Sequence, residues 1–256
     1  MKAIIITVLS ILLTAVLVVG NIHWGNVKTS SLNNNANSPV SSSSVNYIDS
    51  DYYLQFADAW PEDSQKQLES AINNDDTYHI LLLGSESIGN LDIGLMPNLR
   101  EALTNTFDKY VSINSMVYNE TTSNYVLNGD TETLIDEKPD MIIFEPFLLS
   151  DNNIIGINTT LTNLSTIIKE TKEQLPNVTF ILQPANPIYN ASLYPTQVAA
   201  LKDYAASENI TYLDHWKDWP EGNSTEILDY INQDGTPNKK GYEIWSNYIT
   251  DFLISE

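Results

Sequence analysis

Small polar and acidic side chains follow several short apolar runs of this 256-residue sequence. Residues 84–89 (GSESIG) come directly after one run, residues 150–153 (SDNN) lie just beyond a second, and residues 214–216 (DHW) follow a third. A serine hydroxyl attacks an acyl group when a neighbouring base accepts its proton, and an amide donor can stabilise the oxyanion that forms. A serine, an asparagine and a histidine brought to one edge of a sheet could therefore carry out acyl transfer.

The base is the most restrictive part of this chemistry, because the chain has only three histidines. His23 flanks an apolar N-terminal run, and His79 begins an apolar run whose far end lies about 16 Å away from it in an extended strand. His215 alone follows such a run, so elimination makes it the candidate base, with Asp218 or Asp234 as the carboxylate that orients it. The alternative is a structural histidine packed among neighbouring aromatic side chains.

Apolar runs alternate with amphipathic stretches in the part of the chain that must position these residues. The runs are residues 78–83, 110–117, 140–144, 178–182 and 210–213. They are nearly continuous, as in strands covered on both faces, and the stretches between them repeat apolar residues at helical spacing. This alternation predicts a five-stranded parallel sheet with helices on both faces. The carboxyl ends of parallel strands share one edge, so the polar segments should meet there.

Three segments of the chain resemble sequence blocks of the SGNH (GDSL) hydrolases. The segments are GSESIG at residues 84–89, SDNN at 150–153 and DGTPNKKGYEIW at 234–245. The resemblance spans residues 78–254 and implies a three-layer α/β/α, flavodoxin-like domain. It also implies an esterase or lipase activity, which in this family includes the O-deacetylation of carbohydrates.

The resemblance also implies roles for individual residues. When one residue is inserted in the first block, Ser87 takes the place of the family's nucleophile, and Ser85 is the other possibility. Asn152 or Asn153 takes the place of the asparagine that stabilises the oxyanion.

The chain departs from the family in three places. Without the inserted residue, Glu86 rather than a serine falls on the nucleophile position. Thr236 precedes the Pro-Asn pair where the family has its catalytic histidine. The glycine of the family's oxyanion hole has no clear counterpart, and Gly89 or Gly129 could fill that place.

These departures leave two hypotheses open. The first is an ester hydrolase that deacylates or deacetylates a cell-envelope or extracellular glycan or a small ester. The second is a catalytically degenerate relative that binds a glycan or a partner without turnover. A glycosidase that uses Glu86 is disfavoured, because no spacing supports its pairing with a second carboxylate. The chain has no cysteine and no clustered histidines, so we expect neither a metal site nor a cofactor.

The N-terminal segment predicts attachment to a membrane. Residues 3–20 contain no charged side chain, and at about 1.5 Å per helical residue they nearly cross the hydrocarbon core of a bilayer. No Ala-x-Ala site follows, so we expect residues 1–24 to be a retained signal anchor, with a cleaved signal peptide as the alternative. The Ser- and Asn-rich residues 25–51 predict a disordered linker, and residues 52–256 predict one folded domain on the extracytoplasmic side.

The charge of the chain limits its partners. The formal net charge is −21, and Lys2 and Lys28 are the only two of the twelve basic residues that precede the predicted domain. A strongly acidic domain repels phosphates, so we do not expect nucleic acid as a partner. The expected partners are an ester or acylated-glycan substrate and the membrane, which the N-terminal helix would enter.

The absence of a cleavage site gives a testable expectation about location. We predict that the mature protein keeps residues 1–24 and sediments with membranes after cell lysis. N-terminal sequencing of the membrane and culture-medium fractions checks this. A mature chain in the medium that begins near residue 25 would show that the segment is a cleaved signal peptide.

Overall fold

The computed structural model describes residues 50–255. The predicted anchor, and the predicted linker apart from residues 50 and 51, lie outside this range. Within it, no helix is both long and apolar enough to cross a membrane.

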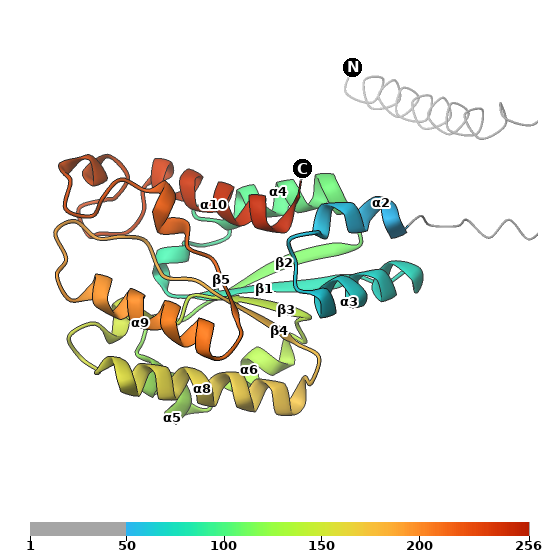
Figure 1. Cartoon of the computed structure of the whole chain (residues 1–256), viewed down its shortest axis with the longest axis horizontal. Coiled ribbons are helices and arrows are strands. Elements are labelled where there is room, and N and C mark those ends of the chain that lie inside the picture. The colour runs from blue at the N-terminus through green and yellow to red at the C-terminus, as the bar shows by residue number, and fades with distance from the viewer. Residues whose placement is uncertain (1–49, 256) are drawn as a thin grey trace, which may run out of the picture. The chain divides into compact units, whose positions relative to one another are not determined.

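A parallel sheet of five strands forms the centre of the domain (Figure 1). The strands are β1 (Tyr78–Gly84), β2 (Val111–Val117), β3 (Met141–Phe144), β4 (Thr179–Leu182) and β5 (Thr211–Tyr212). Their order across the sheet is β2-β1-β3-β4-β5. The five apolar runs of the sequence therefore form the predicted strands, and the predicted parallel sheet is confirmed.

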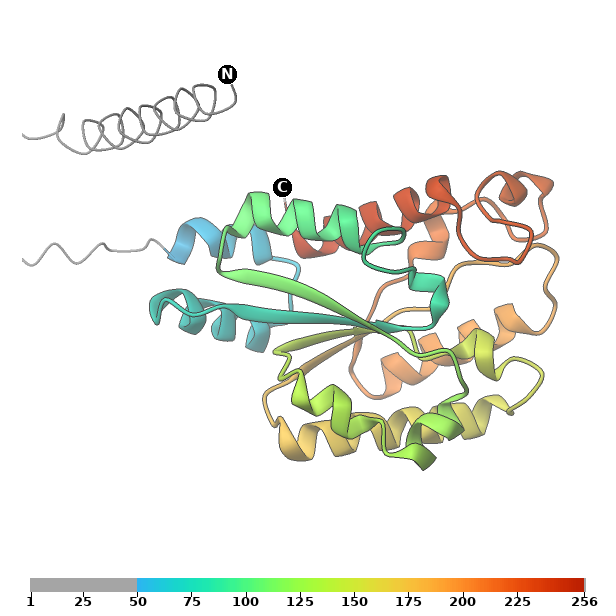
Figure 2. The same cartoon turned by 180° about the vertical axis from the view of Figure 1, so that it is seen from behind.

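Helices cover both faces of the sheet and give the domain three layers. α4 (Met96–Phe107) and α10 (Lys239–Leu253) lie side by side on one face (Figures 1 and 2). The other face carries α5 (Thr122–Asn128), α6 (Thr131–Asp136), α8 (Ile157–Gln174) and α9 (Tyr194–Ser207). The remaining helices are α2 (Ser50–Leu54), α3 (Glu62–Asn73), α7 (Leu148–Asp151) and the 3-10 turns η1 (Gln55–Ala57), η2 (Glu86–Ile88), η3 (His215–Asp218) and η4 (Thr225–Asp229).

The last helix illustrates how the sequence specifies these elements. Tyr242, Trp245 and Ile249 are buried and recur every three or four residues, so one stripe of α10 faces the core. The side chain of Asn238 accepts a hydrogen bond from the backbone N–H of Lys240, which caps the first turn. The resemblance block at residues 234–245 therefore covers the turn and the cap that start α10.

The two ends of the described chain meet at the amino ends of the strands. The indole N–H of Trp60 donates to the carbonyl of Leu253 at 3.0 Å, and the N–H of Ser255 donates to the carbonyl of Phe56 at 2.7 Å. The Trp60 ring also packs on Tyr78, the first residue of β1, with ring centroids 5.3 Å apart. In Figure 1 this junction lies at the opposite end of the sheet from the loops that follow the strands.

The pairing of β1 with β3 positions the polar segments. Leu83 pairs with Phe144, and the N–H of Glu145 donates to the carbonyl of Leu83 at 2.8 Å. The helix α4 that follows β1 and the helix α8 that follows β3 cover opposite faces of the sheet (Figure 1). A crevice forms at the carboxyl ends of two strands whose connections diverge in this way, and ligands bind there in open parallel sheets.

A buried carboxylate secures the segment that follows β3. Asp151 is fully buried, and its Oδ1 accepts the backbone N–H of Thr122 at 2.8 Å. Its Oδ2 accepts the hydroxyl groups of Thr122 and Thr160, each at 2.6 Å. The carboxylate therefore joins α5, α7 and α8, and its three donors offset the cost of burying the charge.

We predict that Asp151→Ala lowers the free energy of unfolding by roughly 3 kcal/mol or more, because three buried donors lose their acceptor. Urea unfolding followed by circular dichroism measures this. The matched control is the exposed Asp203 on α9, whose replacement by alanine should change stability by less than about 0.5 kcal/mol. Equal effects of the two substitutions would contradict the structural role of Asp151.

Candidate active site

The turn after β1 brings two serines to the carboxyl edge of the sheet. Ser85 caps η2, and its Oγ accepts the backbone N–H of Ser87 at 3.3 Å. The N–H of Ser85 donates to Oε2 of Glu145 at 2.7 Å. A Cβ on Gly84 would lie 2.7 Å from a side-chain carbon of Ile88, so glycine is needed for the turn to fold back this closely.

A cavity of about 290 Å³ opens beside these serines. It is lined by Ser85, Glu86, Ser87, Leu149, Ser150, Asn152, Ile188, Asp234, Gly235 and Thr236. The structure therefore brings together four residues that sequence reasoning selected: both serines, one oxyanion candidate and one carboxylate. These residues come from the loops after β1 and β3 and from the loop before α10. The loops after β1 and β3 lie at the carboxyl edge of the sheet, where ligands bind in open parallel sheets.

Three other predicted site residues lie outside the cavity lining. Gly89 has φ = +76° and forms a bridge with Gly94, so it shapes the loop between η2 and α4. Asn153 has φ = +62° in the turn after α7. Asp218 ends η3. None of these three residues therefore contacts the cavity.

The loop before α10 contains a carboxylate without an imidazole. Oδ1 of Asp234 accepts both the hydroxyl of Thr236 at 2.6 Å and its backbone N–H at 3.0 Å. These hydrogen bonds from Thr236 hold the pKa of the Asp234 carboxyl below its ordinary value. At the position where the resemblance places a catalytic histidine, the chain therefore has Thr236, which is hydrogen-bonded to Asp234.

His215 lies in the core and does not line the cavity. The carbonyl of Pro184 can only accept a hydrogen bond, so Nε2 of His215, 2.9 Å away, carries the proton. Nδ1 accepts the indole N–H of Trp219 at 3.0 Å, and the imidazole stacks on Trp245 with centroids 4.5 Å apart. Both ring nitrogens are occupied, so this geometry gives no support to His215 as the base. It matches the alternative of a structural histidine.

Sequence reasoning assigned no role to Glu145, which is fully buried beside the turn. Its burial raises the pKa of the carboxyl, while hydrogen bonds from Ser85 act in the opposite direction. Its Oε1 has no hydrogen-bond partner among the described residues. The available signal was its place directly after an apolar run, at the same sheet edge as the serines.

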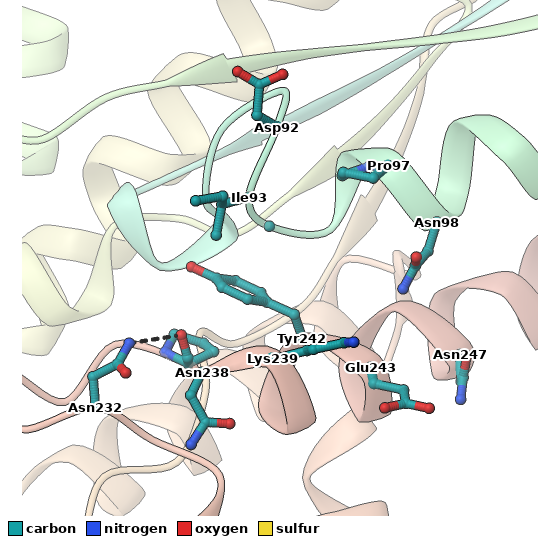
Figure 3. A pocket seen from close by; sticks show the side chains of 12 residues that line it. Asp92, Ile93, Pro97, Asn98, Asn232, Asn238, Lys239, Tyr242, Glu243 and Asn247 are labelled. Carbon is teal, nitrogen blue, oxygen red and sulfur yellow. Dashed lines mark hydrogen bonds between the residues drawn. The ribbon is translucent and has the colours of Figure 1, made fainter.

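A second, larger hollow adjoins the cavity and separates α10 from the loop before α4 (Figure 3). Its volume is about 770 Å³, and it is lined by Asp92, Ile93, Gly94, Pro97, Asn98, Asn232, Pro237, Asn238, Lys239, Tyr242, Glu243 and Asn247. Figure 3 shows the Tyr242 ring extending towards Ile93 across this groove. Burial raises the pKa of the Tyr242 hydroxyl, and the charges of Asp234 and Glu86 act in the same direction.

Neither hollow offers an evident metal site. Within residues 50–255 no group of three or more histidine, cysteine, aspartate or glutamate side chains is arranged to hold a metal ion. The chemistry that the serine cavity offers is nucleophilic attack by a hydroxyl, with amide and backbone N–H groups as donors.

The fold is shared with solved lipases and esterases. A GDSL-like lipase from Bacteroides thetaiotaomicron has a TM-score of 0.52 and 13% identity, with 75% of this chain and 98% of that chain covered. The lipase/acylhydrolase from Enterococcus faecalis has a TM-score of 0.52 and 21% identity, with 68% and 94% covered. Axe2, an acetylxylan esterase from Geobacillus stearothermophilus, has a TM-score of 0.56 and 15% identity, with 69% and 94% covered.

No protein-family model and no curated protein sequence matches the chain. At these low identities, the structural similarity establishes an SGNH-like fold, which is the fold that the sequence resemblance implied. The fold alone does not assign an activity to the chain, and the residues that line the cavity bear on it more directly.

The burial of His215 gives a prediction about pH and stability. Burial lowers the pKa of the imidazole from 6.5 to about 4. Above pH 6.5 the ring is neutral in both states, whereas between pH 6.5 and about 4 only the unfolded chain binds the proton. The folded state is therefore destabilised as pH falls through this window, by roughly 3 kcal/mol in total.

Urea unfolding of the wild type and of His215→Gln at pH 7 and pH 4 measures this difference. Glutamine can keep a donor and an acceptor but does not titrate, so the variant should lose roughly 3 kcal/mol less between the two pH values. Equal losses would show that His215 is not buried in its neutral form.

Proposed function

We propose that this protein is an SGNH-type serine ester hydrolase that deacylates a glycan or a small ester. The observation that carries the proposal is the cavity, in which Ser85 and Ser87 meet Asn152 at the carboxyl ends of β1 and β3. One serine would attack the ester carbonyl. The side-chain amide of Asn152 and backbone N–H groups of the η2 turn would stabilise the oxyanion.

The neighbouring groove supports a carbohydrate as the carrier of the acyl group. Amide side chains, including those of Asn98, Asn232 and Asn247, line it together with the Tyr242 ring. Such side chains offer donors and acceptors without a net charge, which suits a neutral chain of hydroxyl groups. The net charge of −21 would also repel polyanionic carriers. One structural neighbour is an acetylxylan esterase, and we extend that substrate class to this chain as part of the proposal.

A second candidate is a protein that binds an acylated glycan without hydrolysing it. The specific observation in its favour is that neither histidine of residues 50–255 lines the serine cavity. Thr236 bonded to Asp234 occupies the loop where the resemblance implies the catalytic histidine.

We also propose that the enzyme acts outside the cytoplasm, as a single-pass membrane protein. The support is the charge-free run at residues 3–20 and the Ser- and Asn-rich stretch that follows it. This placement would bring the cavity to envelope or extracellular glycans.

We predict that the full-length protein hydrolyses p-nitrophenyl acetate and releases acetate from acetylated xylan. Replacing the nucleophilic serine by alanine should lower kcat/KM by at least about 100-fold, because the attacking oxygen is lost. Ser85→Ala and Ser87→Ala, assayed separately by absorbance at pH 7, identify which serine it is.

Ser207→Ala is the matched control, since its exposed hydroxyl lies at the end of α9 and only bonds to its own helix. A folded His215→Gln variant should keep most of the activity, because both ring nitrogens of His215 are already hydrogen-bonded within the core. A wild type that releases no acid but binds the acetylated glycan in calorimetry would replace the hydrolase proposal with the binding one.

A further inference from the structure

The carboxyl group of Glu145 is buried beside the candidate nucleophiles. The side chain is fully buried, and Oε2 lies 2.7 Å from the backbone nitrogen of Ser85. The same oxygen would lie 3.2 Å from a Cβ on Gly84, so the carboxyl packs directly against the backbone of the turn. Buried carboxyl groups without a cationic partner are costly, and no salt bridge to Glu145 occurs within residues 50–255.

The hydrogen bonds around Ser85 leave its proton available. Oγ of Ser85 accepts the N–H of Ser87, so a lone pair points towards η2 and the hydroxyl proton is not used in that bond. On the other side, Oε1 of Glu145 has no partner among the described residues. The hydroxyl of Tyr194 on α9 is also buried without a partner among residues 50–255, and burial and then the charge of Glu145 raise its pKa. The unused proton of Ser85 and the unpartnered oxygen of Glu145 thus belong to two residues that the hydrogen bond from the Ser85 N–H to Oε2 joins at the end of β1.

We propose that Glu145 is the general base of the site and that it selects Ser85 as the nucleophile. This rests on the proposed ester hydrolysis. The carboxylate would accept the serine proton, as the imidazole does in a Ser-His-Asp triad. It follows β3, the strand next to β1, whereas the resemblance places the catalytic histidine in the loop before α10.

Glu145 accepts the proton of the Ser85 hydroxyl as Oγ forms a bond to the ester carbonyl carbon, giving a tetrahedral oxyanion. The carbon–oxygen bond to the alcohol then breaks, and the proton passes from Glu145 to the leaving alkoxide, which leaves acyl-Ser85. Water adds to this ester while Glu145 takes one of its protons. The carbon–Oγ bond then breaks, and the proton returns to Ser85 as the free acid leaves.

The environment suits a carboxylate to this task. Burial raises the pKa of Glu145, which makes its carboxylate a stronger base than one in water. Hydrogen bonds from Ser85 and from the N–H groups of Leu148 and Phe147 act in the opposite direction and favour the charged form.

The competing interpretation is that Glu145 only holds the turn in place by accepting the N–H of Ser85. Glu145→Gln separates the two roles, because the amide oxygen can keep that hydrogen bond while the amide cannot take a proton. Glu101→Gln on the exposed face of α4 is the matched control.

The experiment compares full-length wild type, Glu145→Gln, Glu101→Gln, Ser85→Ala and the double variant Glu145→Gln/Ser85→Ala with p-nitrophenyl acetate. We expect Glu145→Gln and Ser85→Ala each to lower kcat/KM by at least about 100-fold, and the double variant to be hardly worse than either, since the two groups act as a unit. Glu101→Gln should match the wild type. Thermal unfolding monitored by circular dichroism verifies that each variant is folded.

A second measurement holds even if Glu145→Gln does not fold. The wild type is treated with a fluorophosphonate, and the modified peptide is identified by mass spectrometry. Modification of Ser85 supports the proposal, whereas modification of Ser87 or of neither serine overturns it. An active, folded Glu145→Gln variant overturns the role of Glu145 while the hydrolase proposal stands. A wild type inactive on all esters overturns both.

Discussion

The in-register pairing of β1 with β3 is the constraint on which the site depends. Leu83 lies opposite Phe144, so the backbone segments that follow β1 and β3 begin side by side. The turn after β1 therefore contacts Glu145, the residue after β3. A shift by one residue would turn Glu145 to the other face of the sheet. The backbone N–H of Glu145 donates to the carbonyl of Leu83, and the backbone N–H of Ser85 donates to the side chain of Glu145, so two hydrogen bonds stabilise the same junction.

Three buried polar side chains of the domain, Asp151, His215 and Glu145, differ in how their hydrogen bonds offset the cost of burial. The Asp151 carboxyl accepts hydrogen bonds from three donors, and the His215 imidazole lies between one donor and one acceptor. Glu145 is the exception, because one of its carboxyl oxygens has no partner in the part of the chain that the structure describes. Incomplete satisfaction of a buried group is uncommon in folded proteins and is typical of places where a group must be free to react.

The sequence predicted the sheet and much of the cavity because both follow from local patterns. Apolar runs specify buried strands, and the ends of parallel strands share an edge, so Ser85, Ser87 and Asn152 could be placed together without coordinates. The direction of a side chain is not a local property. His215 also follows an apolar run, yet its imidazole turns into the core against Trp245. Glu145 was missed because a lone glutamate beside a strand carries no motif.

The junction of Phe56 and Trp60 with the last residues of α10 has a practical consequence for handling this domain. Both ends of the described chain lie at the amino ends of the strands (Figure 1). The cavity is lined by residues that follow the carboxyl ends of β1 and β3. Immobilisation through either end would therefore leave the cavity mouth turned away from the support. A bulky insoluble polymer could then reach the serines of an enzyme held on a surface, without interference from the attachment point.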